Sequence, residues 1–201
     1  MKETLGNKEK IFFTAVRLFA QKRYHSVTMR EIAQEVGIKA ASIYNHYESK
    51  EALLEAIVEY FRASLCEQVY PSFEVMGEIP LRAFLEGTIQ ATDDLFTRPI
   101  LSDISRIIVR EQFASEQIRL LLLEELIQKP RQMFAQYFSV LMQNGKMRKA
   151  DPILAAKEYH AYFIYRFYEN SLMIDSGEPD FSKDLTEHNA HLDLFIAHFC
   201  L

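Results

Sequence analysis

The stretch VGIKAASIYNHYESKE, from Val36 to Glu51, decides how the first part of this chain folds. It places a Lys, a Ser, two Tyr, an Asn and a His close together, and such side chains are poor material for a core. Gly37 can adopt the left-handed conformation that ends a helix, and beyond it Ile43 and Tyr47 lie one helical turn apart. The stretch therefore predicts two short helices joined by a glycine turn, a helix-turn-helix.

Helices are predicted on both sides of this turn. A stripe of apolar residues predicts a first helix over about residues 8–22. Thr28-Met29-Arg30-Glu31 has the form of a capping box, which starts a short helix over about residues 29–36. Ser49 is placed to cap a longer helix that runs to about Gln68.

If the apolar residues of this motif pack against the first helix, its polar and small residues point outward. The residues expected inside are Ile32, Ala33, Val36, Ile38 and Ile43, and those expected outside are Arg30, Lys39, Ala40, Ser42, Tyr44, Asn45 and His46. Such a face suits the major groove of DNA. The small Ala41 lets the backbone approach, Ser42 and Asn45 can hydrogen-bond to base edges, and Arg30 can bind guanine with two hydrogen bonds.

Lys50 lies in the first turn of the helix that follows Ser49. A cation there opposes the helix dipole by about 0.3 to 1 kcal/mol. A DNA phosphate would instead meet both its charge and the free N–H groups of the helix terminus. We therefore predict a phosphate contact for Lys50, with a solvated surface position as the alternative.

The composition predicts an all-α protein. Only six Gly and six Pro interrupt the 201 residues, and the segments between them carry apolar residues at helical spacing. Residues 1–50 hold nine Lys and Arg against five Asp and Glu, a net charge of +4, whereas the rest hold 14 against 23, a net charge of −9. A basic module joined to an acidic body indicates that only the first part approaches a polyanion.

In this region the chain resembles the TetR family of bacterial transcriptional regulators. The matching residues are Phe19, Tyr24, Thr28, Ile32-Ala33, Gly37-Ile38, Ser42-Ile43-Tyr44, His46-Tyr47, Ser49-Lys50-Glu51 and Leu53. The resemblance implies a three-helix DNA-binding domain, placed at residues 1–50, and a larger helical domain at 51–201 that dimerises and binds a small molecule. By the same likeness, phosphate contacts fall to Thr28, Tyr44 and Lys50, base contacts to Arg30, Ala41, Ser42 and Asn45, and either role to His46.

Two positions depart from the family pattern. Arg23 stands where the family often has a glycine, before the aromatic Tyr24, and Lys39 stands where it often has a serine cap. The first departure affects the end of the first helix. The second affects the start of the third helix, and it adds a cation that can reach the DNA backbone or a base.

Beyond residue 70, Pro and Gly positions divide the chain into further helices. They are expected near 80–96, 100–113, 116–127, 130–144, 152–175 and 182–200, about nine helices in all, with 116–144 as one helix kinked at Pro130 as the alternative. Asp151-Pro152 forms a good helix start.

The last two helices carry more apolar surface than a single-sided core requires. We expect them to pair with their copies across a two-fold axis, which would match a palindromic operator. The residues predicted at this dimer interface are Tyr159, Phe163, Phe167, Leu192, Phe195 and Phe199. A ligand cavity lined by the same aromatics is a compatible alternative.

A ligand pocket is expected at the centre of the larger domain. Its candidate residues are Phe84, Phe96, Arg110, Phe113, Phe134, Phe138, Met142 and Tyr162, each of which has ordinary core packing as the alternative. The apolar candidates favour a hydrophobic effector. Arg106 or Arg110, if directed inward, would favour an anionic one.

Several classes of function receive no support from the sequence. Cys66 and Cys200 lack the spacing of a disulfide framework or zinc site, and the His188 and His191 pair is better explained as polar interface positions than as a metal site. We find no GxGxxG, P-loop, HExxH or GxSxG motif, no membrane-length apolar run and no leader peptide. A sequence pI of about 5.7 argues against a DNA-packaging protein.

We therefore predict a cytoplasmic, ligand-responsive transcriptional regulator without catalytic residues, cofactor or metal. It would act as a repressor, binding a palindromic double-stranded DNA operator as a homodimer and leaving it when a small-molecule effector binds. A helical enzyme, or a ligand-binding protein without sequence-specific DNA binding, is the alternative.

Overall fold

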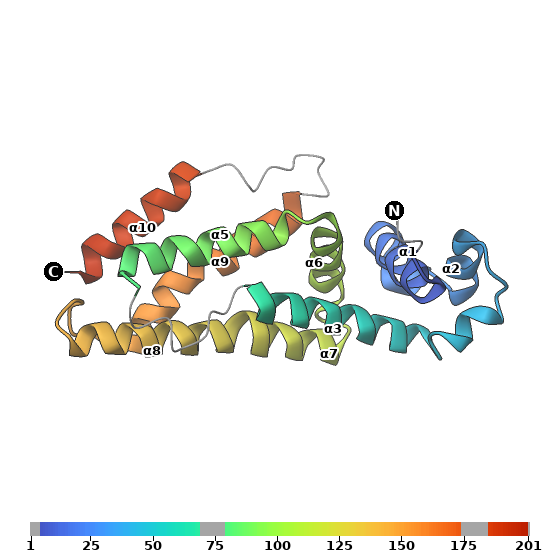
Figure 1. Ribbon diagram of the computed structural model, residues 1–201, viewed down its shortest axis with the longest axis horizontal. Helices are drawn as coiled ribbons and strands as arrows, with labels where there is room; N and C mark the ends of the chain where they lie inside the picture. The colour runs from blue at the N-terminus through green and yellow to red at the C-terminus, as the bar shows by residue number, and fades with distance from the viewer. Residues whose placement is uncertain (1–4, 69–78, 174–184, 201) are drawn as a thin grey trace. The chain divides into compact units, whose positions relative to one another are not determined.

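The computed structural model describes residues 5–68, 79–173 and 185–200, and within these ranges the regular structure is helical (Figure 1). The all-α prediction is confirmed. None of the helices in the described ranges is both long and apolar enough to span a membrane.

The chain divides into two compact units. The first comprises Met1–Ala63 and Arg98–Leu120, and the second comprises Ser64–Thr97 and Leu121–Leu201. The boundary expected at residue 50 falls inside the first unit, because most of a long helix and two later helices belong to it.

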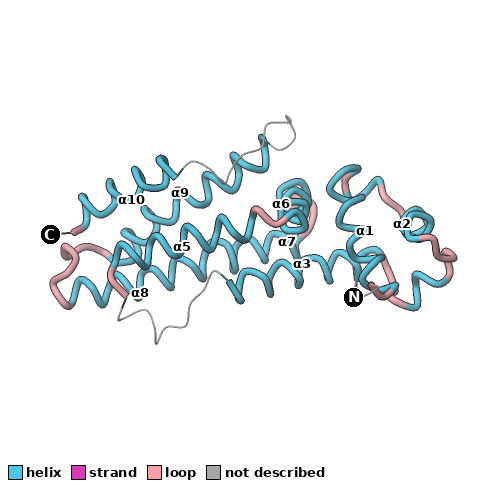
Figure 2. The backbone as a smooth tube through the Cα atoms, turned by 45° about the horizontal axis from the view of Figure 1, so that its top comes forward, coloured by secondary structure: helices cyan, strands magenta, loops and turns pink. Residues whose placement is uncertain are grey.

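The first unit is built around α1 (Asn7–Lys22), which packs against α2 (Met29–Val36) and α6 (Pro99–Glu111). Figures 1 and 2 show α6 beside α1 although they are far apart in sequence. The unit also contains η1 (Tyr24–Ser26), η2 (Ser42–Asn45), α7 (Glu116–Leu121) and the first part of α3 (Lys50–Gln68). Its fully buried side chains include Ile11, Ala15, Phe19, Ile32, Ile43, Leu53, Phe61, Leu101 and Ile104.

The second unit consists of α5 (Leu81–Phe96), η3 (Leu122–Gln128), α8 (Lys129–Gln143), α9 (Pro152–Met173) and α10 (Leu185–Phe199), with the last part of α3. Its core is rich in aromatic side chains, among them Phe84, Phe134, Tyr137, Phe138, Tyr159 and Phe195. The buried Tyr159 hydroxyl donates to the carbonyl oxygen of Leu85 at 3.1 Å, which ties α9 to α5.

The helix starts follow the capping residues that the sequence predicts. The hydroxyl oxygen of Thr28 accepts a hydrogen bond from the backbone N–H of Glu31 at 3.2 Å at the start of α2. Ser49 accepts from the N–H of Ala52 at 3.0 Å at the start of α3, and Asp151 accepts from the N–H of Ile153 at 2.8 Å at the start of α9. These contacts satisfy N–H groups that have no partner inside the helix.

Residues 116–143 form one continuous helical run, so the alternative of a single helix is the correct one. Its middle, η3, is π-helical rather than kinked at Pro130: the N–H of Lys129 donates to the carbonyl oxygen of Glu124, five residues earlier. Pro130 has no N–H to donate. The wider π turn just before it changes the hydrogen-bond register where a donor is missing.

The third helix of the motif is shorter than predicted. Only η2 is regular there, a single 3₁₀ turn in which the N–H of His46 donates to the carbonyl oxygen of Ile43 at 3.0 Å. Lys39 precedes this turn and cannot accept a hydrogen bond from a free N–H with its side chain, as a serine would. The missing cap accounts for the short element.

Two turns of the first unit each contain a residue with a positive φ. Gly37 has φ 80° and ψ 29°, which ends α2 as predicted. Arg23, at the end of α1, has φ 69° and ψ 148°, a conformation that costs a residue with a side chain about 1 to 3 kcal/mol. The departure at Arg23 therefore places strain where the family often has glycine.

We predict that Arg23→Gly raises the free energy of unfolding by about 1 kcal/mol, because glycine adopts this backbone without strain. The gain is measured by thermal or denaturant unfolding. Gln21→Gly, an exposed position inside α1, is the matched control and should lower stability by about 0.5 to 1 kcal/mol. Equal destabilisation by both glycines would contradict the strain at Arg23.

Candidate DNA-binding face and ligand pocket

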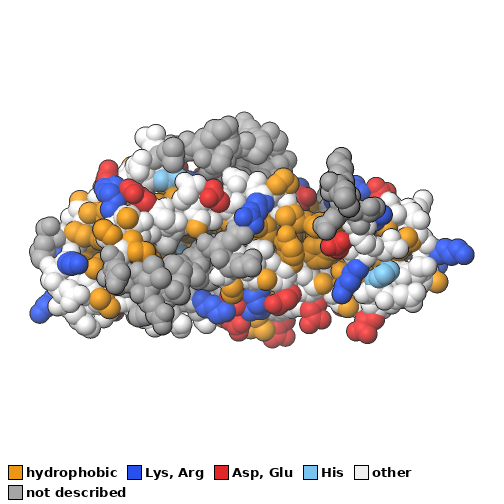
Figure 3. Space-filling view, viewed as in Figure 1, with side chains coloured by type: hydrophobic (Ala, Val, Ile, Leu, Met, Phe, Trp, Pro, Cys, Tyr) orange, Lys and Arg blue, Asp and Glu red, His pale blue; other side chains and the backbone are white. Residues whose placement is uncertain are grey.

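The residues predicted to contact DNA come from α2, η2 and the turns beside them. Arg30, Lys39, Ala41, Tyr44 and Asn45 are exposed. Thr28 is exposed as well and caps α2, whereas Ser42 and His46 are half-buried. In Figure 3, blue Lys and Arg side chains protrude at the end of this unit where Figure 1 labels α2. We call the group from Thr28 to His46 the α2–η2 face.

The acidic residues beside this face are held by other cations. Glu35 pairs with Arg17 at 2.6 Å, and Glu31 pairs with Lys22 at 2.6 Å. The hydrogen bond from Lys22 lowers the pKa of the Glu31 carboxyl. Arg30 has no ion-pair partner among the described residues, so its guanidinium is available to an external acceptor.

Lys50 turns inward more than the sequence indicates. Its ammonium donates to the carbonyl oxygens of Tyr24 at 3.1 Å and Val27 at 3.0 Å, and it lies 4.3 Å from the centre of the Tyr24 ring. Burial, together with the neighbouring Glu51 carboxylate, raises the pKa of Tyr24 to about 12, so the ring stays neutral beside the cation. Lys50 thus closes the η1 turn, a structural role that its position in the sequence does not reveal.

Two of the predicted pocket residues lie in the first unit, and both predictions are wrong. Arg110 donates to the backbone carbonyl oxygen of Ala20, at the end of α1. Phe113 follows α6 and is 95% exposed. Arg106 pairs with Asp103 at 3.4 Å on the same helix. Arg110 therefore serves the contact between α6 and α1, and Arg106 has an ion pair within α6.

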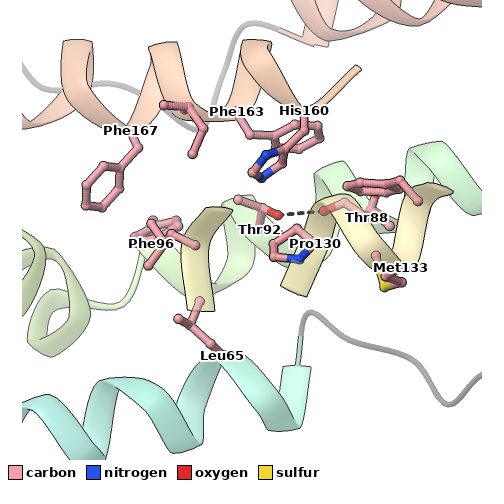
Figure 4. Close-up of a pocket in the computed structure, with 12 residues that line it drawn as sticks. Leu65, Thr88, Thr92, Phe96, Pro130, Met133, His160, Phe163 and Phe167 are labelled. Carbon is pink, nitrogen blue, oxygen red and sulfur yellow. Dashed lines mark hydrogen bonds between the residues drawn. The ribbon is translucent and has the colours of Figure 1, made fainter. Parts of the chain in front are cut away.

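The second unit contains a largely apolar cavity, shown in Figure 4. It encloses about 510 Å³ of space between atoms, a figure that includes open solvent at its mouth. The lining residues are Leu65, Thr88, Thr92, Phe96, Leu126, Pro130, Met133, Phe134, His160, Phe163, Ile164 and Phe167. They come from α3, α5, η3, α8 and α9.

The sequence placed some of these residues and missed others. Phe96 and Phe134 line the cavity, whereas Phe84, Phe138 and Met142 pack in the aromatic core. The prediction missed His160 and the two threonines. A histidine on an apolar stretch of α9 was the one available signal, and it does not distinguish a pocket from a core.

Tyr162 belongs to a buried polar cluster instead of the cavity. Its hydroxyl lies 2.8 Å from Nδ1 of His188, whose Nε2 lies 2.8 Å from a carboxylate oxygen of Asp93. Arg166, also buried, donates to the Tyr162 hydroxyl at 3.0 Å. Burial raises the pKa of Asp93, against the opposing charges of His188 and Arg166. This cluster joins α5, α9 and α10.

Most of the residues predicted at the dimer interface are buried within their own chain. Tyr159, Phe167, Leu192 and Phe195 are buried, and Phe163 and Phe199 are half-buried. These assignments need correction, because the aromatic side of α9 and α10 faces the core of its own unit. The apolar side left exposed carries other residues: Leu154, Ala161, Tyr165, Tyr168 and Leu172 on α9, and Ala190, Leu194 and Ala197 on α10. We call these residues the α9–α10 face.

Two family models match the chain. The family model described as "Bacterial regulatory proteins, tetR family" matches residues 11–57, which include the α2–η2 face. The model described as "AefR-like transcriptional repressor, C-terminal domain" matches residues 83–199, more than half of the chain. The chain belongs to the TetR family of bacterial transcriptional regulators. The members of this family are regulators, not enzymes.

Relatives within the TetR family are similar over different lengths. YerO, an uncharacterized HTH-type transcriptional regulator of Bacillus subtilis (strain 168), is 28% identical over 187 residues, which are 85% of this chain and 60% of YerO. IcaR of Staphylococcus aureus (strain Newman), the negative regulator of the biofilm operon icaADBC, is 42% identical over 52 residues, 26% of this chain and 28% of IcaR. The match thus spans less than two thirds of either relative.

A solved structure shows the same fold over nearly the whole chain. It is the triclosan complex of SmeT, the repressor of the Stenotrophomonas maltophilia multidrug efflux pump SmeDEF. The TM-score is 0.70 at 19% identity, covering 97% of this chain and 92% of SmeT.

We predict that Lys50→Met lowers the free energy of unfolding by about 1 to 3 kcal/mol, because two carbonyl oxygens in part-buried contacts lose a charged donor. Denaturant unfolding of the purified protein measures the loss. Lys22→Met removes only an exposed ion pair and should cost less than about 1 kcal/mol. A loss at Lys50 no larger than that at Lys22 would show that the η1 turn does not depend on the ammonium.

Proposed function

We propose that this TetR-family protein is a ligand-responsive repressor that binds a palindromic operator as a homodimer. The α2–η2 face carries the proposal. Arg30, Tyr44 and Asn45 are exposed on it, so their side chains are available to DNA rather than used in the core. IcaR is a negative regulator, and the SmeT structure contains triclosan, which supports repression and effector binding in this chain. The cytoplasm, where operator DNA lies, is the proposed location.

The α2–η2 face supplies groups for both bases and phosphates. Arg30, Ser42 and Asn45 are the proposed base contacts, and Ala41 allows close approach of the backbone. Tyr44, 55% exposed, and Thr28 are proposed to contact phosphates.

Three cations or potential cations extend this phosphate contact. Lys50 keeps one of its three N–H donors beyond the two bonded to carbonyls, so a phosphate contact is compatible with its structural role. Lys39 and His46 flank η2 and add charge or a hydrogen bond at the DNA backbone.

The α9–α10 face supports the proposed dimer. Its exposed residues Ala161, Tyr165, Tyr168 and Leu172 recur at spacings of three and four along α9, and Leu154 lies seven residues before Ala161. Leu194 is 74% exposed and Leu172 is 72% exposed. Several exposed apolar residues on one face, rather than any single leucine, mark a candidate interaction site. A second copy of this chain offers the same face and satisfies the symmetry of a palindromic site.

Chain connectivity suggests how a ligand affects DNA binding. Leu65 lines the cavity on α3, a helix that begins at Lys50 beside the α2–η2 face. Phe96 ends α5 two residues before the chain passes to the first unit, and Leu126 lies in the helical run that continues from α7. We propose that a bound effector shifts these three segments and favours a dimer whose reading elements no longer fit successive major grooves.

Selection of genomic fragments with the purified protein tests the proposal, followed by a ligand screen against the selected duplex. A regulator enriches a short palindromic sequence and releases it when an effector is added. Recovery of fragments without a shared sequence, together with ligand binding, would instead favour the alternative of a binding protein without sequence-specific DNA recognition.

We predict that Arg30→Ala weakens binding to the selected operator by about 1 to 3 kcal/mol and relaxes the preference at one base pair. Fluorescence anisotropy with a series of single-base-pair variants measures both effects. Arg119→Ala, an exposed arginine on α7, is the control and should bind as the unaltered protein does. An unchanged base-pair profile in Arg30→Ala would remove Arg30 from the base contacts.

We predict that Leu194→Arg produces a monomer, because a charge at the centre of an apolar two-fold interface faces its own copy. Light scattering at micromolar concentration measures the mass. Leu120→Arg on α7, where the leucine is 38% exposed, is the matched control and should stay dimeric. A dimer that survives Leu194→Arg would place the interface elsewhere.

A further inference from the structure

His160 is the polar side chain in the cavity that has no partner of its own. Its ring is 5% exposed, and Figure 4 shows it directed from α9 into the space above Thr92. Nδ1 is buried and has no hydrogen bond to any described residue. A buried polar group without a partner costs about 1 to 3 kcal/mol, so the free protein is less stable for keeping it.

The imidazole of His160 is uncharged at neutral pH. Burial, with the charge of Arg131 as a smaller contribution, lowers its pKa to about 4. A neutral imidazole presents one N–H donor and one acceptor nitrogen. The cavity therefore offers a donor and an acceptor at the same ring.

The two threonines of the cavity hydrogen-bond to backbone carbonyl oxygens of their own helix, α5. The Thr92 hydroxyl donates to the carbonyl oxygen of Thr88 at 2.7 Å, and the Thr88 hydroxyl donates to the carbonyl oxygen of Leu85 at 2.8 Å. The Thr88 hydroxyl also lies 3.1 Å from the Tyr159 hydroxyl, and either oxygen can be the donor there. The Thr92 oxygen can therefore accept from a ligand, and an anionic group would meet this acceptor on the α5 wall of the cavity.

The walls around His160 are aromatic. The rings of Phe134 and Phe163 lie 6.0 Å and 6.1 Å from the His160 ring, measured between centroids. Phe96 and Phe167 form another pair at 5.6 Å. Flat aromatic molecules gain offset or edge-on ring contacts in such surroundings.

We infer that the effector is an uncharged aromatic molecule with a hydroxyl group, of the phenol class, and that this hydroxyl hydrogen-bonds to His160. A phenol both donates and accepts, which matches the imidazole, and its proton can also go to Thr92. Arg106 and Arg110 lie in the first unit and do not line the cavity, so neither of them supports an anionic effector. The inference rests on the proposed function only in calling the ligand an effector.

Three probes of similar size test the ligand class: 2-naphthol, naphthalene and 2-naphthoate. Titration calorimetry or ligand fluorescence with the full chain and no DNA gives each dissociation constant, so the result does not depend on operator binding. We expect 2-naphthol to bind about tenfold more tightly than naphthalene, one hydrogen bond's worth, and more tightly than the anion. In His160→Phe the ratio between 2-naphthol and naphthalene falls to about one.

The free His160→Phe variant provides a second readout, because it replaces an unpartnered polar ring with an apolar one. Its melting temperature should exceed that of the unaltered protein. The folded-state pKa of His160 lies below that of the unfolded chain, so stability falls as the pH drops from about 6.5 toward 4. The advantage of the variant is therefore larger at about pH 5 than at about pH 7. His198→Phe, an exposed histidine on α10, should show neither change.

The inference is overturned by tighter binding of 2-naphthoate, or by a 2-naphthol preference that survives His160→Phe. Absence of binding by all three probes up to about 1 mM also overturns it. If His198→Phe abolishes the preference for 2-naphthol over naphthalene, the inference is also overturned, because the naphthol hydroxyl would then be recognised outside the cavity. Failure of the protein to select an operator would leave these binding results unaffected and would count only against the proposed repressor function.

Discussion

Burial of Ile32 and Ile43, on either side of the left-handed turn at Gly37, is the constraint on which the DNA-binding unit depends. Both side chains are fully buried, and each contributes about 1.5 to 3 kcal/mol by leaving water. With these two residues inside, helical geometry directs Arg30 and Asn45 to solvent. Neither the core nor the exposed face can change without the other, because they are opposite sides of the same short elements.

Helix limits were predictable because they depend on local chemistry, as at the caps Thr28, Ser49 and Asp151. Long-range contacts were not: the sequence could not show that Lys50 bonds to the η1 turn or that Arg110 reaches Ala20. The dimer residues failed for a related reason. Helix α9 is apolar on several sides, and periodicity does not tell which side the chain covers itself. The sites in the second unit therefore needed the structure, whereas the α2–η2 face did not.

Two local features of the chain lower its stability, one at a position where it departs from the family pattern and one in the cavity. Arg23 holds a backbone conformation suited to glycine, and Nδ1 of His160 is buried without a hydrogen bond to any described residue. Native stability is only about 5 to 15 kcal/mol, so such losses are large for local features. The His160 ring lies in a cavity lined by segments that are joined along the chain to the DNA-binding unit. The binding free energy of a ligand that hydrogen-bonds to this ring can favour a different position of those segments.

The central claim is that the α2–η2 face fits one duplex sequence, presented by two copies of the chain. The direct measurement is the ratio of affinities for the enriched palindrome and for bulk competitor DNA, determined by competition at fixed, low ionic strength. We expect a ratio of about a thousand or more, with two chains bound to each duplex. A ratio near one would contradict it, since electrostatic attraction alone would then account for all the binding.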